Sequence, residues 1–190
     1  CFAAQPFATD LINSNRKAFR YELVWDKVAV VGFLNANRQP LRQHELLLVF
    51  CRRPGASVYT PQKTPGKPYV SKARKDRSTV YRSHGAIDTV NTGWRHPTSI
   101  LRHPRPSRGR RHPTEKPLSL CEWLMLSYTR PGSIVLDSFM GSAPVGEACL
   151  KHGRRFIGIE RDKTIYGVAR DRLLPLMDAR SIARCPAVAA

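Results

Sequence analysis

Hydrophobic and polar positions form two strand-like patterns in the first fifty residues. The segment YELVWDK alternates, and it places Tyr21, Leu23 and Trp25 on one face. Such alternation is typical of a strand with one buried face. The segment HELLLVF instead contains a continuous apolar run from Leu46 to Phe50. A continuous run of this length predicts a strand that is covered on both faces, as in an α/β sheet.

The first residues predict two further elements. CFAAQPF has the pattern of the end of a buried strand, and PFATDLINSN that of a short helix with Pro6 in its first turn. The chain opens on Cys1 rather than Met, and the opening strand has no earlier element to pair with. We therefore expect the chain to be N-terminally incomplete.

The most regular pattern runs from residue 112 to about residue 178. It predicts a helix, a strand, a second helix, a second strand and a third helix, in the segments EKPLSLCEWLMLSYT, GSIVLD, VGEACLKHG, RRFIGIE and DKTIYGVARDRLLPLM. The first helix is apolar on most sides and is expected to be largely buried. Gly153 closes the second helix, at a position that favours glycine. Strand, helix and strand in this order predict a β-α-β unit with a parallel pair.

Residues 52–111 differ in amino-acid composition from the segments on either side. They hold seven of the fifteen prolines and almost no apolar periodicity, so they are expected to be mostly loop with short strands. The patterns thus divide the chain into residues 1–51, 52–111, 112–180 and a frayed tail, 181–190. A chain of 190 residues has room for one ordinary domain with an insertion, and its expected fold class is α/β.

Composition excludes several classes of protein. With 42% hydrophobic and 24% charged residues, the chain resembles soluble globular proteins. No apolar run approaches the about 20 residues of a membrane-spanning helix, so no membrane association and a cytoplasmic location are expected. The five cysteines are scattered without a CxxC pair, and three of the four histidines His84, His96, His103 and His112 precede proline. No metal site is therefore expected.

Net charge distinguishes residues 52–111 from the rest of the chain more sharply than proline content does. The chain carries 32 Lys and Arg against 14 Asp and Glu, a net charge of +18. Residues 52–111 hold 15 basic residues and two acids, or +13, whereas the other 130 residues carry +5. A polyanion is the natural partner of such a segment, although a solvated basic surface loop would have the same composition. The position of the segment between two ordered parts of the chain favours nucleic acid.

Two carboxylates end the two predicted strands of the β-α-β unit. Asp137 closes the first strand, and a turn with Gly141 and Ser142 leads into the helix. Glu160 ends the next strand about twenty residues further on, where an acid can accept hydrogen bonds from both ribose hydroxyls. The arrangement predicts a nucleoside site, and structural capping of strand and helix ends is the alternative.

Several separated motifs occur in one recognisable order. The chain resembles the permuted class of DNA amino-methyltransferases, in which cofactor motifs follow the catalytic and target-reading segments, in HPTEKP, VLDSFMGSAPVGEAC and RRFIGIERD. It is similar to that family's middle strands, and to the segments flanking its recognition insert, in QPF, YELVWDK, GFLNANRQPLRQHELLLVF and RHPTSIL. The likeness covers residues 1–178 and extends to phage and restriction-modification versions.

This resemblance implies a Rossmann-like sheet with circularly permuted motif order and a basic, loop-rich insert. It implies S-adenosylmethionine as cofactor and methyl transfer to the exocyclic amine of adenine (N6) or cytosine (N4) in DNA. By matching position, the cofactor-binding residues would be His112, Pro113, Thr114, Lys116, Asp137, Phe139, Gly141, Ser142 and Glu160. The first four would lie by the methionine end of the cofactor, the next four beneath it, and Glu160 at its ribose.

The resemblance also assigns roles to the three main segments. Residues 1–51 and 112–180 would form the methyltransferase core, the latter holding the cofactor, and residues 52–111 would form the target-recognition insert. Double-stranded DNA is then the expected partner, and the oligomeric state is left open. The candidate DNA-binding residues are Arg74, Lys75, Arg77, Arg82, Arg95 and Arg102.

The sequence departs from the family pattern in two places. The catalytic tetrapeptide, an Asp, Asn or Ser followed by Pro-Pro and an aromatic residue, is expected before the opening strand and does not occur in these residues, so no catalytic residue is assigned. The second departure is SAPVG, where the family leads one to expect Ser-Gly-Thr. Ala143 would restrict a turn that Gly relaxes, and Pro144 removes an N–H unless it occupies the first helical position. Weakened cofactor binding is the resulting hypothesis.

Two other functions stay open on sequence grounds. A catalytically inactive DNA-binding remnant would share the basic segment while lacking the catalytic tetrapeptide. A methyltransferase acting on RNA or on a small molecule would share the cofactor motifs, although the large basic segment disfavours a small substrate.

Overall fold

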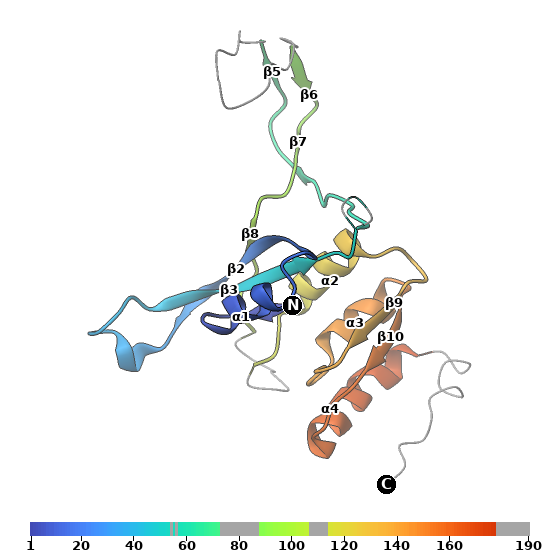
Figure 1. Ribbon diagram of the computed structural model, residues 1–190. Helices are drawn as coiled ribbons and strands as arrows, with labels where there is room; N and C mark the ends of the chain where they lie inside the picture. The colour runs from blue at the N-terminus through green and yellow to red at the C-terminus, as the bar shows by residue number, and fades with distance from the viewer. Residues whose placement is uncertain (54, 56, 73–87, 107–113, 178–190) are drawn as a thin grey trace. The chain divides into compact units, whose positions relative to one another are not determined.

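The computed structural model describes residues 1–53, 55, 57–72, 88–106 and 114–177 (Figure 1). The chain divides into two compact units, which are described separately. The first comprises Cys1–Thr60 together with Ser99–Ala190, and the second comprises Pro61–Thr98. In the sequence, the second unit is inserted between the two segments that form the first.

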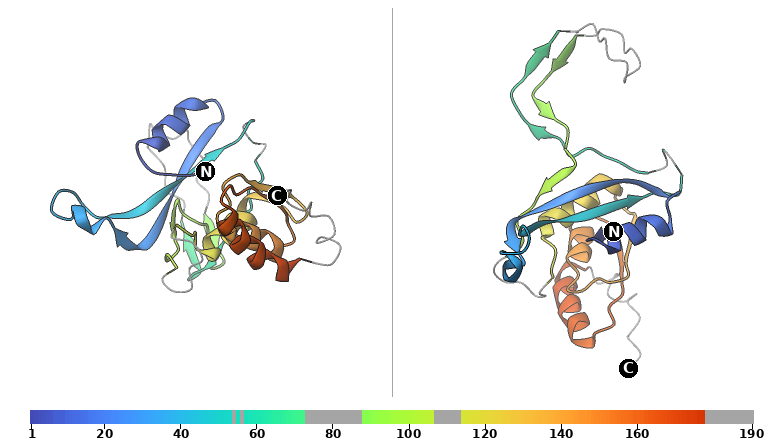
Figure 2. Two further views of the ribbon diagram at one scale, coloured as in Figure 1. Left: turned by 90° about the horizontal axis from the view of Figure 1, so that it is seen from below. Right: turned by 60° about the vertical axis from the view of Figure 1, so that its left-hand side comes forward.

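The first unit contains a four-stranded sheet with the order β1-β3-β2-β8. Its strands are β1 (Phe2–Ala3), β2 (Phe19–Val31), β3 (Arg42–Phe50) and β8 (Ile100–Arg102). β3 pairs antiparallel with both β1 and β2, whereas β8 runs parallel to β2. Figures 1 and 2 show β2 and β3 as one long hairpin. The predicted strand over residues 21–27 is confirmed, and it is longer than the alternating segment alone indicates.

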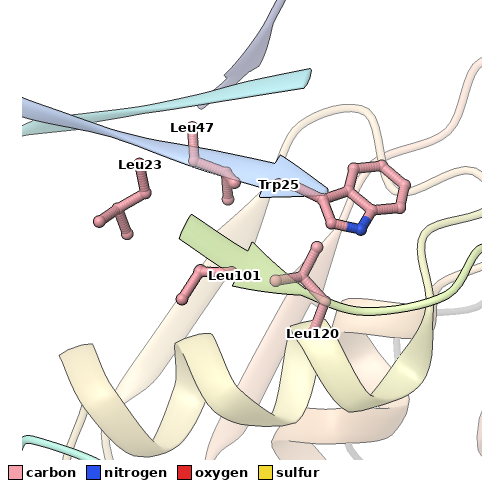
Figure 3. Close-up of a cluster of buried hydrophobic side chains, with 5 residues drawn as sticks. All are labelled: Leu23, Trp25, Leu47, Leu101 and Leu120. Atoms are coloured by element: carbon pink, nitrogen blue, oxygen red, sulfur yellow. The ribbon is translucent and has the colours of Figure 1, made fainter. Parts of the chain in front are cut away.

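One face of this sheet forms the main hydrophobic cluster (Figure 3). The cluster joins Leu23 and Trp25 of β2, Leu47 of β3 and Leu101 of β8 to Leu120, which lies on helix α2 (Leu118–Tyr128). Trp25 is 1% exposed, and its indole N–H donates a 2.8 Å hydrogen bond to the carbonyl of His103. Tyr21 shares this face by alternation yet stays exposed, because it lies beyond the buried cluster.

The opposite face of the sheet is covered by helix α1 (Phe7–Ser14). Ala8 of the helix packs against Ala3 and Leu48, and the half-buried Leu46 and Phe50 surround them. Leu47 and Leu48 thus point to opposite covered faces. The prediction that the apolar run of β3 is covered on both sides is confirmed.

The C-terminal part of the first unit is a β-α-β unit followed by a helix. Its elements are β9 (Ile134–Asp137), α3 (Pro144–Lys151), β10 (Arg155–Gly158), α4 (Lys163–Leu173) and the short 3-10 helix η2 (Leu174–Leu176). β9 and β10 pair in parallel, with Ile134 opposite Arg155 and Asp137 opposite Gly158. The predicted parallel β-α-β unit is therefore confirmed, and so is the closure of α3 at Gly153, which has a φ of +70°.

Helix α2 packs against the β-α-β unit as well as against the sheet. Cys121 and Met125 form a second cluster with Ala148 and Cys149 of α3, and Phe156 of β10 packs against it. This side of the β9–β10 pair is covered. The alternate residues of the two strands are on the uncovered side and are each more than half exposed: Ile134, Leu136, Ile157 and Ile159.

The second unit is an antiparallel ribbon of short strands. β4 (Thr64–Pro65) pairs with β7 (Trp94–Arg95), and β5 (Tyr69–Ser71) pairs with β6 (Thr89–Asn91). The ribbon lies within the range expected for the insert, residues 52–111, as mostly loop with short strands. The flanking strand β8 instead belongs to the sheet of the first unit. The expected frayed tail lies outside the described residues.

The buried guanidinium of Arg154 caps the C-terminal end of helix α2. Arg154 is 6% exposed; its Nε donates to the Thr129 hydroxyl at 3.0 Å and its Nη2 to the Thr129 carbonyl at 2.9 Å. Weaker contact with the Met125 carbonyl at 3.4 Å extends the cap into the last helical turn. Carbonyls at a helix end lack intrahelical partners, so a cation placed there stabilises the helix.

Replacement of Arg154 by Met should therefore destabilise the protein while keeping most of the side-chain volume. We expect a loss of about 2–4 kcal/mol in the free energy of unfolding, because several buried acceptors lose their donor. Urea unfolding followed by circular dichroism measures the change. The neighbouring exposed Arg155, replaced in the same way, is the matched control and should change stability by less than ~0.5 kcal/mol. Equal effects of the two substitutions would contradict the capping role.

Candidate functional site

Two parallel strands end at the same edge of the first unit. β9 ends at Asp137, and its partner β10 ends at Gly158, two residues before Glu160. The Ile159 N–H continues the pairing by donating to the Asp137 carbonyl at 2.9 Å. Ligands of open α/β sheets bind outside the carboxyl ends of parallel strands. The predicted residues Asp137 and Glu160 thus lie at the carboxyl-end edge of the β-α-β unit, where a ligand site is expected.

Glu160 connects the two loops that leave these strands. Its Oε2 accepts a 3.1 Å hydrogen bond from the Gly141 N–H, and its Oε1 accepts a 3.0 Å hydrogen bond from the Asp162 N–H. Glu160 remains partly exposed. The structure therefore brings Gly141 and Glu160 together, as the sequence predicts for a nucleoside site. It also gives the carboxylate a loop-capping role, which the sequence left as the alternative.

The loop after β9 is a tight turn with a bare aromatic side chain. The Asp137 carboxylate accepts a 3.1 Å hydrogen bond from the Phe139 N–H. The phenyl group of Phe139 is 91% exposed, so it is free to cover a flat ligand. Gly141 has a φ of +54°, a conformation that glycine adopts without steric cost.

The two unexpected residues of this loop fit the turn differently. Pro144 occupies the first turn of α3, where its missing N–H leaves no helical hydrogen bond unmade. Ala143 takes a left-handed conformation with φ +55°, which costs an L-residue about 1–2 kcal/mol. Its methyl group is fully buried against Met140 and Ala169, and this packing offsets part of the cost. Only Ala143 therefore carries the strain that the sequence suggested.

Ser142 is held by a buried network of charges. Its hydroxyl donates to Glu115 Oε2 at 3.1 Å, and its carbonyl accepts from Arg172 Nη1 at 2.7 Å. Arg172 also forms ion pairs with Glu115 and, at 3.2 Å, with Glu147 of α3. The side chains of Glu115 and Arg172 are 7% and 9% exposed. Three elements thus meet at one turn: the segment before α2, the start of α3 and helix α4.

These network residues were missed by sequence reasoning. The sequence suggested Thr114 as N-cap and Glu115 in the first turn of the following helix, which is wrong because α2 begins at Leu118 after Pro117. Arg172 has the pattern of an ordinary charge on an exposed helix face. The two are 57 residues apart, so no local spacing signals their pairing. The only available signal was an acid within a motif otherwise assigned to ligand binding.

Lys116 faces the four-stranded sheet rather than the Gly141–Ser142 turn. Its ammonium lies 3.4 Å from Glu45 of β3 and above the rings of Phe2 and Trp25, at 5.0 and 5.7 Å from their centroids. Lys27, which is 6% exposed, donates to the same carboxylate at 2.6 Å. Glu45 therefore neutralises two cations at the end of the HPTEKP segment.

The pKa of Glu45 reflects this setting. Burial alone would raise the pKa, but the Lys27 hydrogen bond and the charge of Lys116 outweigh it and lower the pKa below its ordinary value of 4.5. Among the buried thiols, desolvation raises the pKa of Cys121 to about 12 and that of Cys149 to about 11. These two thiols are therefore unreactive packing groups.

The remaining predicted residues are described in part. His112, Pro113, Arg74, Lys75, Arg77 and Arg82 lie outside the described residues. Arg102 is exposed, with Asp26 at 3.9 Å. The Arg95 side chain is held within the ribbon. Its Nη1 donates to Asn91 Oδ1 at 2.7 Å, and its guanidinium carbon lies 4.9 Å from the centroid of the Tyr69 ring. Thr114 is exposed, and its carbonyl accepts a long 3.4 Å hydrogen bond from Lys116.

The described parts of the chain contain neither a metal-binding cluster nor a membrane-spanning helix. Across residues 1–53, 55, 57–72, 88–106 and 114–177, no three His, Cys, Asp or Glu side chains are grouped to hold a metal ion. Within the same ranges, no helix has the length and apolar character needed to cross a membrane.

The fold places the chain in the class of mixed α/β proteins, and solved DNA methyltransferases share this fold. M1.HpyAVI in complex with SAM superimposes with a TM-score of 0.58 at 24% identity, covering 90% of this chain and 72% of that protein. The cytosine-N4-specific PvuII DNA methyltransferase gives 0.59 at 14% identity, covering 91% and 57%. TTHA0409 of Thermus thermophilus, a putative DNA modification methylase complexed with S-adenosyl-L-methionine, gives 0.54 at 20%, covering 92% and 62%.

Sequence comparison identifies the family within that class. The family model for N6/N4 methyltransferases, described as DNA methylase, matches residues 5–171, and the chain belongs to this family. The type II methyltransferase M2.DpnII of Streptococcus pneumoniae is 44% identical over 63 residues, which are 33% of this chain and 24% of that protein. The putative methylase YubD of Escherichia coli K12 is 42% identical over 73 residues, 38% and 32% of the two chains. The alignments thus span a third or less of these relatives.

Arg172→Met should loosen the Ser142 turn and destabilise the protein. The substitution takes the buried guanidinium away from the carboxylates of Glu115 and Glu147, so we expect a loss of about 3–5 kcal/mol in urea unfolding. The exposed neighbour Arg170, which pairs with Asp171, is the control and should change stability by less than ~1 kcal/mol. If Arg172→Met behaved like Arg170→Met, the buried network would have no structural role.

The lowered pKa of Glu45 predicts a pH-dependent difference between wild type and Glu45→Gln. Because the folded-state pKa is depressed, the carboxylate contributes stability above its unfolded value of 4.5, and this contribution disappears as pH falls through the folded-state pKa. The variant should therefore be less stable than wild type near neutral pH, and the gap should close in acid. Urea unfolding from about pH 7 to about pH 3 tests this. A gap that stays constant, or that equals the gap for the exposed Glu22→Gln, would contradict it.

Proposed function

We propose that this chain carries the S-adenosylmethionine-binding and DNA-binding parts of a DNA amino-methyltransferase. The observation that carries the proposal is the placement of Asp137, Gly141 and Glu160 at the carboxyl ends of two parallel strands in a chain of the N6/N4 DNA methylase family. The methyl group would pass to N6 of adenine or N4 of cytosine in double-stranded DNA, in the cytoplasm. In this proposal the cofactor part would follow the target-reading part, which is the permuted order that the sequence resemblance implies.

Each part of the site has a distinct task in this proposal. Glu160, whose carboxylate already orients the Gly141 N–H, would accept hydrogen bonds from the ribose hydroxyls. The exposed ring of Phe139 and the backbone from Asp137 to Ser142 would line the space beneath the cofactor. The 112–116 segment, with His112, Pro113, Thr114 and Lys116, would lie toward the methionine end, the Lys116 ammonium being paired with Glu45 on the sheet side of that space.

The chemistry assigned to the cofactor is a direct methyl transfer. Bound S-adenosylmethionine would supply an electrophilic methyl group: the amine nitrogen would bond to the methyl carbon as the carbon–sulfur bond broke, leaving a neutral thioether, and the proton lost by the amine would pass to solvent water. The amine lies inside a base pair, so the target base must leave the duplex, which costs a few kcal/mol. Phosphate contacts from residues 52–111, among them the exposed Arg102, would offset part of that cost.

A second function, DNA binding without methyl transfer, is favoured by one observation. Residues 1–190 contain no Pro-Pro dipeptide and hence no tetrapeptide of the expected catalytic type. Transfer of a radiolabelled methyl group from S-adenosylmethionine to duplex DNA, with RNA of the same sequence as a parallel substrate, separates the two functions. Labelled duplex supports the methyltransferase, whereas duplex binding without label supports the second function.

Glu160→Gln should weaken S-adenosylmethionine binding more than it weakens the fold. The amide keeps one acceptor oxygen but loses the charge that strengthens hydrogen bonds to ribose hydroxyls. We expect the Kd from isothermal titration calorimetry to rise about tenfold or more. The exposed Asp171→Asn on α4 removes the same charge away from the site and should leave the Kd unchanged. Equal Kd values for wild type and Glu160→Gln would overturn the assignment of the ribose site.

A further inference from the structure

The hairpin between β2 and β3 ends in a turn of exposed apolar side chains. The tip is the 3-10 helix η1 (Phe33–Asn35), where Phe33 is 76% and Leu34 84% exposed. Val30 below them is 53% exposed. Figures 1 and 2 show this hairpin projecting from the helices of its own unit. Phe33 and Leu34 are adjacent, and contiguous exposed apolar side chains are commonly found at interaction surfaces.

Backbone hydrogen bonds hold the turn that carries these side chains. Gly32 enters it with a φ of +85°, and its carbonyl accepts from the Asn35 N–H at 2.9 Å. The Asn35 carbonyl in turn accepts from the N–H groups of Arg38 and Gln39 at 2.9 and 3.0 Å. The backbone that carries Phe33 and Leu34 is thus held by hydrogen bonds, which reduces the backbone entropy lost on binding.

The strand below the tip is bent at a bulge. Between the pairs Asp26–His44 and Val31–Arg42 the β2–β3 register shifts, and within this stretch Val28 has a φ of +59°. A β-branched residue rarely adopts that conformation, and here the Asp26 carboxylate accepts its N–H at 2.8 Å. Strain of this kind persists where the surrounding structure enforces it, commonly at functional sites.

The polar residues around the tip are either basic or uncharged amides. From residue 28 to residue 43 the hairpin contains no acid, and it carries Arg38 and Arg42 together with the amides of Asn35, Asn37 and Gln39. Apolar wedges flanked by arginine and amide side chains are the equipment of proteins that enter the minor groove and unstack a base step. The positive charge of the tip complements a polyanion, whereas an apolar protein surface would gain nothing from it.

We propose that Phe33 and Leu34 form a wedge that enters duplex DNA beside the target site. The proposal rests on the proposed function and deepens it, because it places a DNA contact on the core sheet, outside residues 52–111. Wedging would open the stack at one step, lowering the remaining cost of extruding the target base. Arg38 and Arg42 would hold the flanking phosphates, and the amides would face the groove.

The test compares the double variant Phe33→Ala, Leu34→Ala with wild type and with Phe7→Ala. Phe7 on α1 is 58% exposed and serves as an apolar control on the same unit. Binding to a labelled duplex is measured by fluorescence anisotropy at several salt concentrations, and unstacking by the fluorescence of 2-aminopurine placed through the duplex. Sedimentation velocity gives the oligomeric state of all three proteins.

We expect the double variant to bind the duplex about tenfold or more weakly, with an unchanged salt slope, because the lost contacts are apolar. The rise in 2-aminopurine fluorescence should occur with wild type and Phe7→Ala only. Duplex affinity and fluorescence equal to wild type would overturn the wedge while leaving the proposed function standing. Loss of a wild-type dimer without loss of duplex affinity would overturn it in favour of self-association. No duplex binding by wild type would overturn both proposals.

Discussion

Helix α2 must pack against two partners at once, and the rest of the first unit depends on that constraint. Leu120 closes the cluster on the four-stranded sheet, while Cys121 and Met125 pack against helix α3. The helix is consequently buried on two sides, and it has no polar face wide enough to allow rotation about its axis. The Arg154 guanidinium then fixes its C-terminal end to the start of β10. Any change in the position of α2 therefore displaces both layers.

The same constraint positions the candidate site. The segment that enters α2 sends Glu115 to the turn at Ser142 and Lys116 to Glu45 of the sheet. Two neighbouring side chains with opposite charge thus bind the two layers that α2 separates. The turn at Gly141 is fastened a second time by Glu160, from the strand on its other side. A preorganised turn of this kind loses little entropy when a ligand binds.

Local patterns predicted the parts of the structure that local forces determine. The alternation of β2, the continuous run of β3 and the β-α-β unit all followed from periodicities of one or two elements. Long-range pairings could not be predicted this way. No hydrophobic period near residue 100 indicates that β8 joins the sheet through Leu101, and no spacing near Arg172 indicates Glu115 as its partner. The candidate site was proposed from its two strand-end carboxylates, Asp137 and Glu160, whereas the buried charges that hold its turn had no signal in the sequence.

The central claim is that the loops after β9 and β10 form a nucleoside-binding site, and hydrogen–deuterium exchange tests it most directly. Exchange is compared without and with S-adenosylmethionine, followed by mass spectrometry of peptides covering the whole chain. Our account predicts slower exchange in peptides spanning residues 137–143 and 158–162, with the β2–β3 hairpin unchanged. Saturating cofactor that leaves both segments unchanged, or that protects only other regions, would contradict it.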